Sequence, residues 1–244
     1  MALGLQMGLA GGGAGGGPIY GLWLDGVDDV GTLDSPTLPT TGNWELKFRM
    51  TAAAGWTPGA NTYGIGQRSS GGNQMMVGVD SVGTTVRLLV GAQPVPTIAG
   101  LVRGTEYECS ITRVGDLFTL TVDGLGTAAA TSAGHTMSTA DTAIGLVTGT
   151  SYWKGVFRDL RSYNSAGTLI GQWLIDGNLD ADAEDQVGSN DMTLAGSPDL
   201  AVSSDGGATW IQAALLTAML LTGFDPAEAG SEWALIATDR KSVV

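Results

Sequence analysis

The chain has 244 residues, of which 43% are apolar and 14% charged, so it can bury a core and is not disordered as a whole. Its formal net charge of −13 argues against a nucleic-acid partner, because phosphate contacts need clustered basic residues, and the eleven here are scattered along the sequence. The 39 glycines follow no three-residue period, which excludes collagen, and they suit short strands joined by tight turns.

Residues 1–17 are predicted to form an arm ahead of the folded domain. Its larger apolar residues, Leu3, Leu5, Met7 and Leu9, alternate as on one face of an extended strand, and a glycine run follows them. Glycines contribute almost no side-chain area, so we expect neighbouring chains to order the arm and the protein to be a homo-oligomer. The start lacks the basic segment of a secretory signal and any apolar run of membrane-spanning length, so no membrane association is expected.

From Gly21 to about Gly196 the sequence consists of strand-like runs separated by turns. In the run 44–50 the apolar residues fall on every second position, which is typical of a strand with one buried face. No amphipathic helix of ten residues interrupts the series, so the pattern predicts a sandwich or barrel. The clearest runs are 21–25, 44–51, 75–80, 84–90, 106–113, 117–123, 142–147, 153–163 and 169–176.

Four segments resemble the concanavalin A-like, laminin-G-like superfamily. They are LWLDGVDDV at 22–30, TVDG at 121–124, YWKGVFRDLRSY at 152–163, and WLID at 173–176 with DQVGSNDMTL at 185–194. The last element opens the domain in many relatives and closes it here, which suits a sandwich whose first and last strands are neighbours. The resemblance implies an all-β, two-sheet antiparallel jelly roll at residues 18–200, between the arm at 1–17 and a C-terminal segment at 201–244.

The C-terminal segment begins with SSDGGATW at 203–210, which matches the Asp-box pattern S-x-D-x-G-x-T-W. A single copy indicates a folded turn, held by side-chain hydrogen bonds to turn amides with the tryptophan packed beneath, and not a sialidase. The following run 213–221 is apolar all round and too short to cross a bilayer. We expect it to pack on the domain or on another subunit, and periodicity leaves open whether 212–224 is helix or strand.

Asp25, Asp28 and Asp29 are the candidate metal ligands. Three carboxylates within five residues repel one another unless turn amides or a hard cation such as Ca²⁺ satisfies them. We favour capping of turn amides, with calcium as the alternative. A second acidic loop, with Asp176, Asp180, Asp182 and Asp185, is interpreted as solvated.

Trp56, Tyr63, Tyr152 and Trp153 are the candidate glycan-binding residues, because aromatic faces can stack on the apolar faces of sugar rings. Core packing is the favoured interpretation for most of them. Only Trp56, in a turn-rich stretch, is expected to be exposed.

No catalytic set is evident, so the chain is predicted not to be an enzyme and to need no cofactor. Glycosidases on this sandwich present paired carboxylates, but Glu106 and Glu108 look like the wet face of an ordinary strand. The sole histidine, His135, is expected in an exposed loop, and the sole cysteine, Cys109, in the core.

Two functions follow as expectations. The first is a structural or decoration protein of a virus particle, a bacteriophage capsid or tail component, with residues 1–17 and the C-terminal tail contacting other virion proteins. The alternative is a carbohydrate-binding module for a cell-surface or polymer glycan, and a host glycan could also be a partner of the virion protein.

Overall fold

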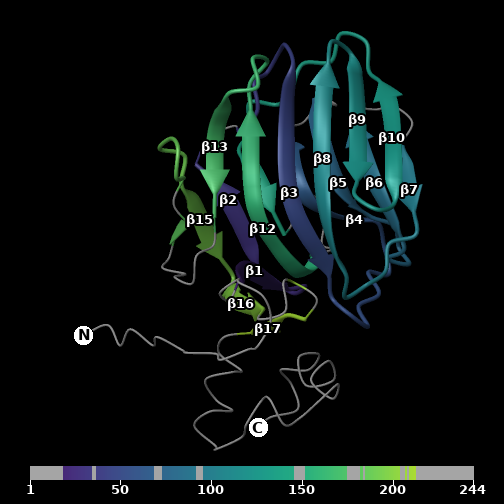
Figure 1. Cartoon of the computed structure of the whole chain (residues 1–244), viewed down its shortest axis with the longest axis vertical. Helices are drawn as coiled ribbons and strands as arrows, with labels where there is room; N and C mark the ends of the chain where they lie inside the picture. The colour runs from purple at the N-terminus through teal and green to yellow at the C-terminus, as the bar shows by residue number, and fades with distance from the viewer. Residues whose placement is uncertain are drawn as a thin grey trace, which may run out of the picture.

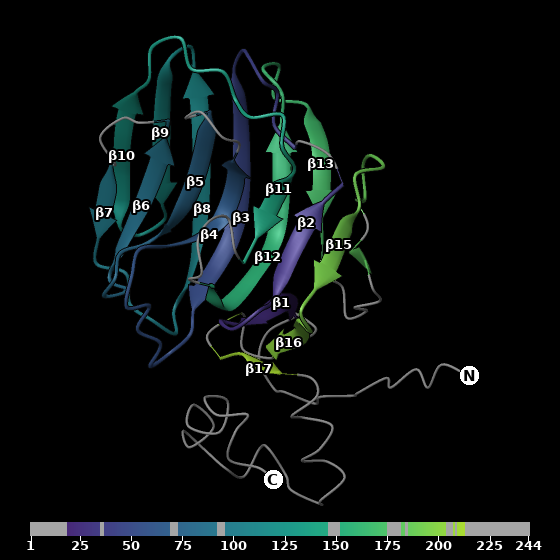
Figure 2. The same ribbon diagram turned by 180° about the vertical axis from the view of Figure 1, so that it is seen from behind.

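The computed structural model describes residues 19–34, 37–68, 73–91, 96–145, 152–174, 182–183, 185–203, 207 and 209–212. These residues form two antiparallel β-sheets packed face to face (Figures 1 and 2). The two-sheet antiparallel jelly roll predicted from the sequence is thereby confirmed. The arm at 1–17 and the run 213–221 lie outside the described residues, and within the described part no helix could cross a membrane.

The nine-stranded sheet has the order β10-β9-β8-β3-β12-β1-β16-β17, and β13 pairs with β12. Its strands are β1 (Ile19–Asp25), β3 (Trp44–Ala52), β8 (Glu106–Val114), β9 (Leu117–Val122), β10 (Gly126–Thr131), β12 (Lys154–Tyr163), β13 (Leu169–Trp173), β16 (Asp199–Ser203) and β17 (Ile211–Gln212).

The eight-stranded sheet has the order β14-β15-β2-β11-β4-β5-β6-β7. Its strands are β2 (Val30–Leu33), β4 (Thr62–Arg68), β5 (Gln74–Val79), β6 (Thr85–Val90), β7 (Thr97–Ala99), β11 (Thr142–Ile144), β14 (Asp182–Ala183) and β15 (Met192–Ala195).

The core lies between the sheets and follows the alternation of the sequence. On β3 the side chains of Trp44, Leu46, Phe48 and Met50 are buried, while the residues between them face away from the second sheet. Cys109 on β8 is buried in the same layer, as predicted.

Glycines allow the strands of the eight-stranded sheet to approach closely. A Cβ atom on Gly78 of β5 would lie 1.9 Å from the carbonyl oxygen of Thr62 on β4. On β4, a Cβ atom on Gly64 would lie 2.7 Å from atoms of Trp153 and Phe157, two aromatic residues of the core. Glycine is therefore a packing residue inside these strands, as well as a turn residue.

β1 lies between β12 and β16, so the beginning and end of the sandwich are hydrogen-bonded neighbours. Ile19 pairs with Ser203 and Leu22 pairs with Leu200. This is the arrangement that the rearranged end motif predicted.

His135 lies in the interior, so the expectation of an exposed loop histidine was wrong. Its ring packs edge-on against Phe118, with ring centroids 5.3 Å apart, and its backbone carbonyl accepts a hydrogen bond from the Arg113 guanidinium. Burial and the neighbouring Arg113 charge lower the pKa of His135.

Asp185 is also buried, so the interpretation of its loop as wholly solvated was wrong at this residue. Its Oδ1 accepts hydrogen bonds from the backbone N–H groups of Gln172, at 2.9 Å, and Val187, at 3.0 Å. Burial acts to raise the pKa of Asp185, but these and neighbouring backbone donors outweigh it, so the pKa is lowered. Asp176 and Asp180, and the side chain of Asp182, lie outside the described residues.

Candidate functional site

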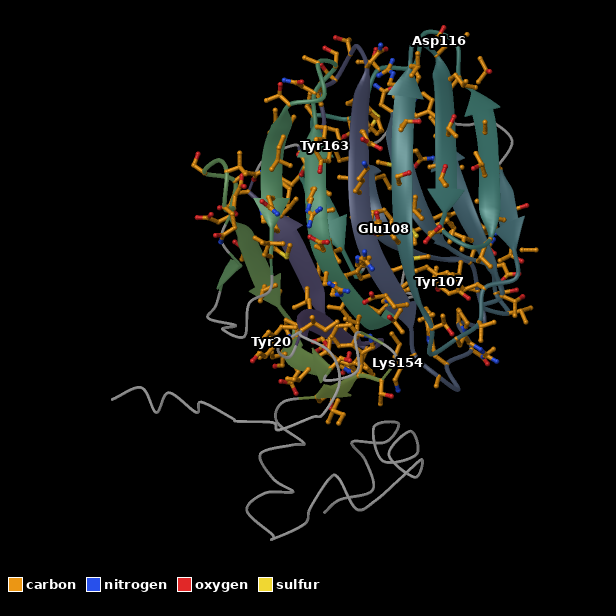
Figure 3. The ribbon with its side chains drawn as sticks, viewed as in Figure 1. Tyr20, Tyr107, Glu108, Asp116, Lys154 and Tyr163 are labelled. Atoms are coloured by element: carbon orange, nitrogen blue, oxygen red, sulfur yellow. The ribbon has the colours of Figure 1, made fainter. Side chains whose placement is uncertain are left out.

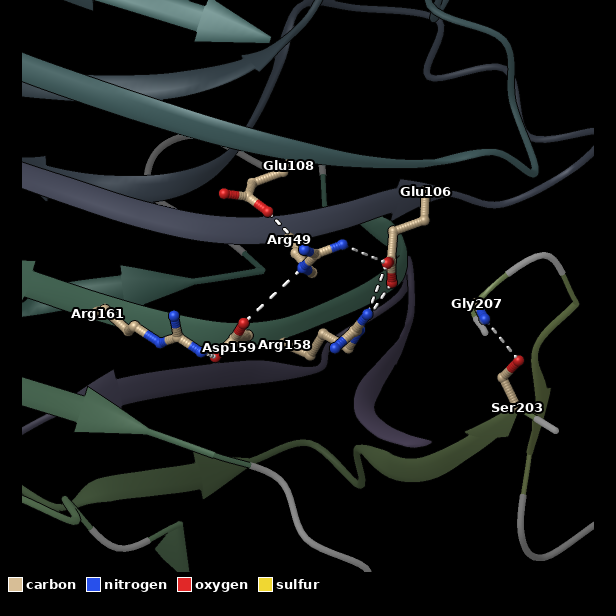
Figure 4. Close-up of polar contacts among 8 residues, drawn as sticks. All are labelled: Arg49, Glu106, Glu108, Arg158, Asp159, Arg161, Ser203 and Gly207. Carbon is tan, nitrogen blue, oxygen red and sulfur yellow. Dashed lines mark hydrogen bonds and ion pairs between the residues drawn. The ribbon is translucent and has the colours of Figure 1, made fainter. Parts of the chain in front are cut away.

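The charged residues of β3, β8 and β12 meet on the outer face of the nine-stranded sheet, the face turned away from the second sheet. Figure 3 labels Glu108 and Tyr163 on this side, and Figure 4 shows the contacts. We call this group the outer-face ion cluster. Its members are Arg49, Glu106, Glu108, Arg158, Asp159 and Arg161.

Strand register explains why residues scattered in the sequence meet here. Arg49 pairs directly with Arg158 on one side and with Glu108 on the other. A β-bulge between Arg158 and Arg161 places Asp159 in the left-handed region, with φ of 58°, and keeps Arg161 on the outer face. The fold thus gathers basic residues that looked dispersed along the chain.

One end of the cluster is covered. Glu106 accepts two hydrogen bonds from Arg158, each 2.7 Å long, and also pairs with Arg49 at 3.3 Å. The Glu106 side chain is only 9% exposed. The two parallel hydrogen bonds from Arg158 make its ion pair with Glu106 bidentate, which is the stronger geometry for an arginine–carboxylate pair.

Gly207 and Trp210 form the cover. The guanidinium carbon of Arg158 lies over the indole ring of Trp210, 5.8 Å from the ring centroid. Gly207 lies against the Glu106 carboxylate. Ser203 Oγ accepts a 2.9 Å hydrogen bond from the Gly207 amide, as the Asp-box pattern predicts. Trp210 also packs with Trp23 and Val156 in a second, smaller apolar cluster on this outer face.

The other end of the cluster is open to solvent. The side chains of Glu108 and Arg161 are 46% and 37% exposed, and each forms an ion pair, Glu108 with Arg49 and Arg161 with Asp159. Beside them, Lys47 lies over the ring of Tyr163 at 5.3 Å. The open end therefore offers neighbouring hydrogen-bond donors and acceptors, next to an aromatic ring, on a sheet surface.

Sequence reasoning missed this cluster. It treated Glu106 and Glu108 as an ordinary wet face, whereas Glu106 is nearly buried and ion-paired. A detectable signal was present, because the runs 44–51 and 153–163 together hold five of the chain's eleven basic residues.

The candidate aromatic residues do not form a joint platform. Trp153 is fully buried in the core, so its assignment as a glycan-binding residue was wrong. Trp56 is half-buried, not exposed, because it packs edge-on against Trp153 with ring centroids 5.3 Å apart. Tyr63 and Tyr152 are half-buried, and the described residues show no contact between their rings.

Asp25, Asp28 and Asp29 converge at the rim of the sandwich, each offering a carboxylate oxygen within 4.8 Å of the other two. Asp29 is 2% exposed, and its two oxygens accept 2.8 Å hydrogen bonds from the backbone amides of Asp25 and Ser197. Asp25 in turn accepts one from the Val27 amide, at 2.7 Å. Burial raises the pKa of Asp29, although its backbone donors oppose the shift.

Asp28 is exposed, so among the three aspartates Asp29 accepts the two amide hydrogen bonds at this rim. Amide donors satisfy Asp29 without an ion. The three oxygens could also ligate a hard cation such as calcium, which takes carboxylate oxygens.

A small apolar void lies among the described core residues between the sheets. It is lined by residues such as Leu22, Phe48, Ile144 and Trp173 and measures about 10 Å³, which is room for one water molecule at most.

No protein-family model matches the chain, and no curated protein matches its sequence. Solved structures do match its fold. A candidate carbohydrate-binding protein from Bacteroides ovatus ATCC 8483 aligns with a TM-score of 0.57 and 13% identity, over 74% of this chain and 58% of that one. The fold shared with that protein is a two-sheet antiparallel β-sandwich.

Two further similar structures align less closely. Domains LG4-5 of the mouse laminin alpha1 chain align with a TM-score of 0.48 and 15% identity, over 65% of this chain and 44% of that one. Domain 4 of an extracellular arabinanase from Geobacillus stearothermophilus, in complex with arabinotriose, aligns with a TM-score of 0.46 and 14% identity, over 64% of this chain and 78% of that one. The chain aligns with less than two thirds of the Bacteroides and laminin chains.

Proposed function

We propose that this lectin-like domain is a non-catalytic carbohydrate-binding module, and that it binds glycan at the open end of the outer-face ion cluster. The arrangement of Glu108, Asp159 and Arg161 beside Tyr163 is the observation that carries the proposal. Sugar hydroxyl groups donate to carboxylates and accept from guanidinium groups, and adjacent ion pairs provide both partners for neighbouring hydroxyls. An aromatic ring can contact the apolar face of the sugar.

The fold supports this proposal, since a structure with the same architecture is described as a candidate carbohydrate-binding protein. The virion role has no comparable support among the similar structures. It rested largely on the arm at 1–17 and the run 213–221, which lie outside the described residues.

The absence of catalysis is part of the proposal. A glycosidase needs one carboxyl group to protonate the leaving oxygen and a second to attack or to activate water. Glu106 is unsuited to either task because two guanidinium groups engage its oxygens and Gly207 covers it. At the open end, Glu108 pairs with Arg49 and Asp159 pairs with Arg49 and Arg161, so both carboxylates there are also held in ion pairs.

Glycan-array binding followed by calorimetry on the best glycan would test the proposal. Arg161→Ala should weaken binding at least about tenfold, because a lost hydrogen bond to a charged group is worth about 1.5–3 kcal/mol. Arg68→Ala removes the same charge from an exposed residue of the second sheet and should leave affinity unchanged. Equal affinity of the wild type and Arg161→Ala would refute this site, and failure to bind any glycan would refute the function.

A further inference from the structure

β10 is an unusually open edge of the sandwich. It pairs with β9 along six consecutive residues without a bulge, and no other described strand pairs with its far side. Natural edge strands are usually short, bulged, charged or covered, because unpaired backbone groups invite another strand. β10, with the sequence GTAAAT, is neither short nor bulged nor charged.

The other edges of the two sheets are protected. Within the described residues, β7 has three residues, whereas β14 and β17 have two each. β13 has five, but the segment after it covers its free side, since Trp173 bridges to Asp185 and the Gln186 amide donates to the Gln172 carbonyl at 2.8 Å. β10, with six residues, is the longest edge strand; β7 of the second sheet lies near it, but no backbone hydrogen bond joins the two among the described residues.

The surface at this edge is uncharged. Neither β9 nor β10 contains an ionisable residue, and the outer face there carries Thr119, Thr121, Thr127 and Ala129, with the exposed Leu117 at one end. The nearest acidic residues, Asp116 and Asp123, lie in the turns at the ends of β9. Two copies of a chain with net charge −13 repel each other over most approaches, so a neutral edge is where they can meet at least electrostatic cost.

We propose that β10 pairs antiparallel with β10 of a second copy, so that the two nine-stranded sheets become one continuous sheet. Identical strands can satisfy each other in this way around a two-fold axis, because the same backbone groups occur on both sides. The alanines at the centre of the strand leave the two backbones free to approach. The axis is perpendicular to the sheet, so both outer-face ion clusters face the same direction.

Sedimentation velocity of the full chain over a wide concentration range would test the pairing. The wild type should form dimers. Ala129→Glu should raise the dimer dissociation constant at least about tenfold, because it places two like charges close together across the axis. Thr119→Glu is the matched control, since Thr119 pairs with Ala129 and faces the same way but lies one strand inside the edge, and it should still dimerise.

Hydrogen exchange and a truncation complete the test. Amides of β10 should be protected in the wild-type dimer and exchange freely in Ala129→Glu, whose unchanged melting temperature at low concentration would show that the monomer still folds. Deletion of residues 1–17 should leave the dimer intact. A wild type that stays monomeric, a dimer unaffected by Ala129→Glu, or a dimer lost with residues 1–17 would each overturn the proposal. The test does not depend on glycan binding.

Discussion

Replacement of Asp29 by alanine should destabilise the sandwich far more than replacement of its neighbour Asp28. Asp29 accepts hydrogen bonds from the part-buried amides of Asp25 and Ser197, which belong to segments at opposite ends of the domain sequence. Asp28 is exposed at the same rim. The two substitutions remove the same charge from nearly the same place, so the difference between them reports hydrogen bonding and burial.

The expected loss can be worked out from these contacts. Each of the two part-buried hydrogen bonds to this carboxylate is worth about 1–3 kcal/mol, and removal of a buried carboxylate whose pKa is raised by desolvation returns part of this sum. We therefore expect Asp29→Ala to lower the free energy of unfolding by about 2–4 kcal/mol, which is roughly 4–16 °C in melting temperature for a domain of this size. Asp28→Ala should stay within about 0.5 kcal/mol of the wild type.

Thermal and denaturant melts of the three proteins, with and without chelator, would decide the matter. Under the capping interpretation, chelator leaves the wild-type melting temperature unchanged. A bound calcium ion would instead make the wild type sensitive to chelator through ligand linkage, and the aspartate variants insensitive. Equal losses in Asp28→Ala and Asp29→Ala, or a chelator effect confined to the wild type, would refute the reasoning.

Three further outcomes follow from the structure. The pKa of His135 is lowered in the folded protein, so its contribution to stability is present above the ordinary value of 6.5 and is lost as the pH falls below it. In denaturant melts, the free energy of unfolding should therefore fall with pH in this range, and it should fall less in His135→Phe. Gly78→Ala should destabilise by about 3 kcal/mol or more through backbone collision, against about 1–2 kcal/mol for Gly124→Ala, where nothing lies within 4 Å, and comparable melts for the two would contradict this. The buried Cys109 thiol, whose pKa burial raises, should resist alkylation until the protein unfolds, as mass spectrometry would show.

Alternation in the sequence was enough to predict most strands of the nine-stranded sheet. The run 44–51 became β3 and the run 106–113 became β8 with small shifts at the ends, since both bury every second side chain. β4 was missed because Gly64 and Gly66 suggest a turn. In the fold, the missing side chains of these glycines leave room for neighbouring side chains and backbone atoms. β10 was missed because alanine-rich sequence carries little strand preference and gains its pairing from β9.

The outer-face ion cluster could not be predicted in the same way. Its members come from three strands, and whether Arg49 meets Glu106 depends on register between segments more than fifty residues apart. The bulge at Asp159 adds a local change of direction that no periodicity indicates. The rim aspartates were easier to find because they are neighbours in sequence, although their separate environments, buried for Asp29 and exposed for Asp28, required the fold.

The pairing of β1 with β16 also determines how the domain would respond to a pulling force. The chain enters at Ile19 directly beside Ser203, and β17 returns along β16 before the described chain ends at Gln212. Tension applied through both flanking segments would therefore act across the strands and load one hydrogen-bonded pair at a time, starting with β17 and then β16. Such a domain should peel open at low force from this corner, while the pairs between β3, β8 and β12 carry almost no load.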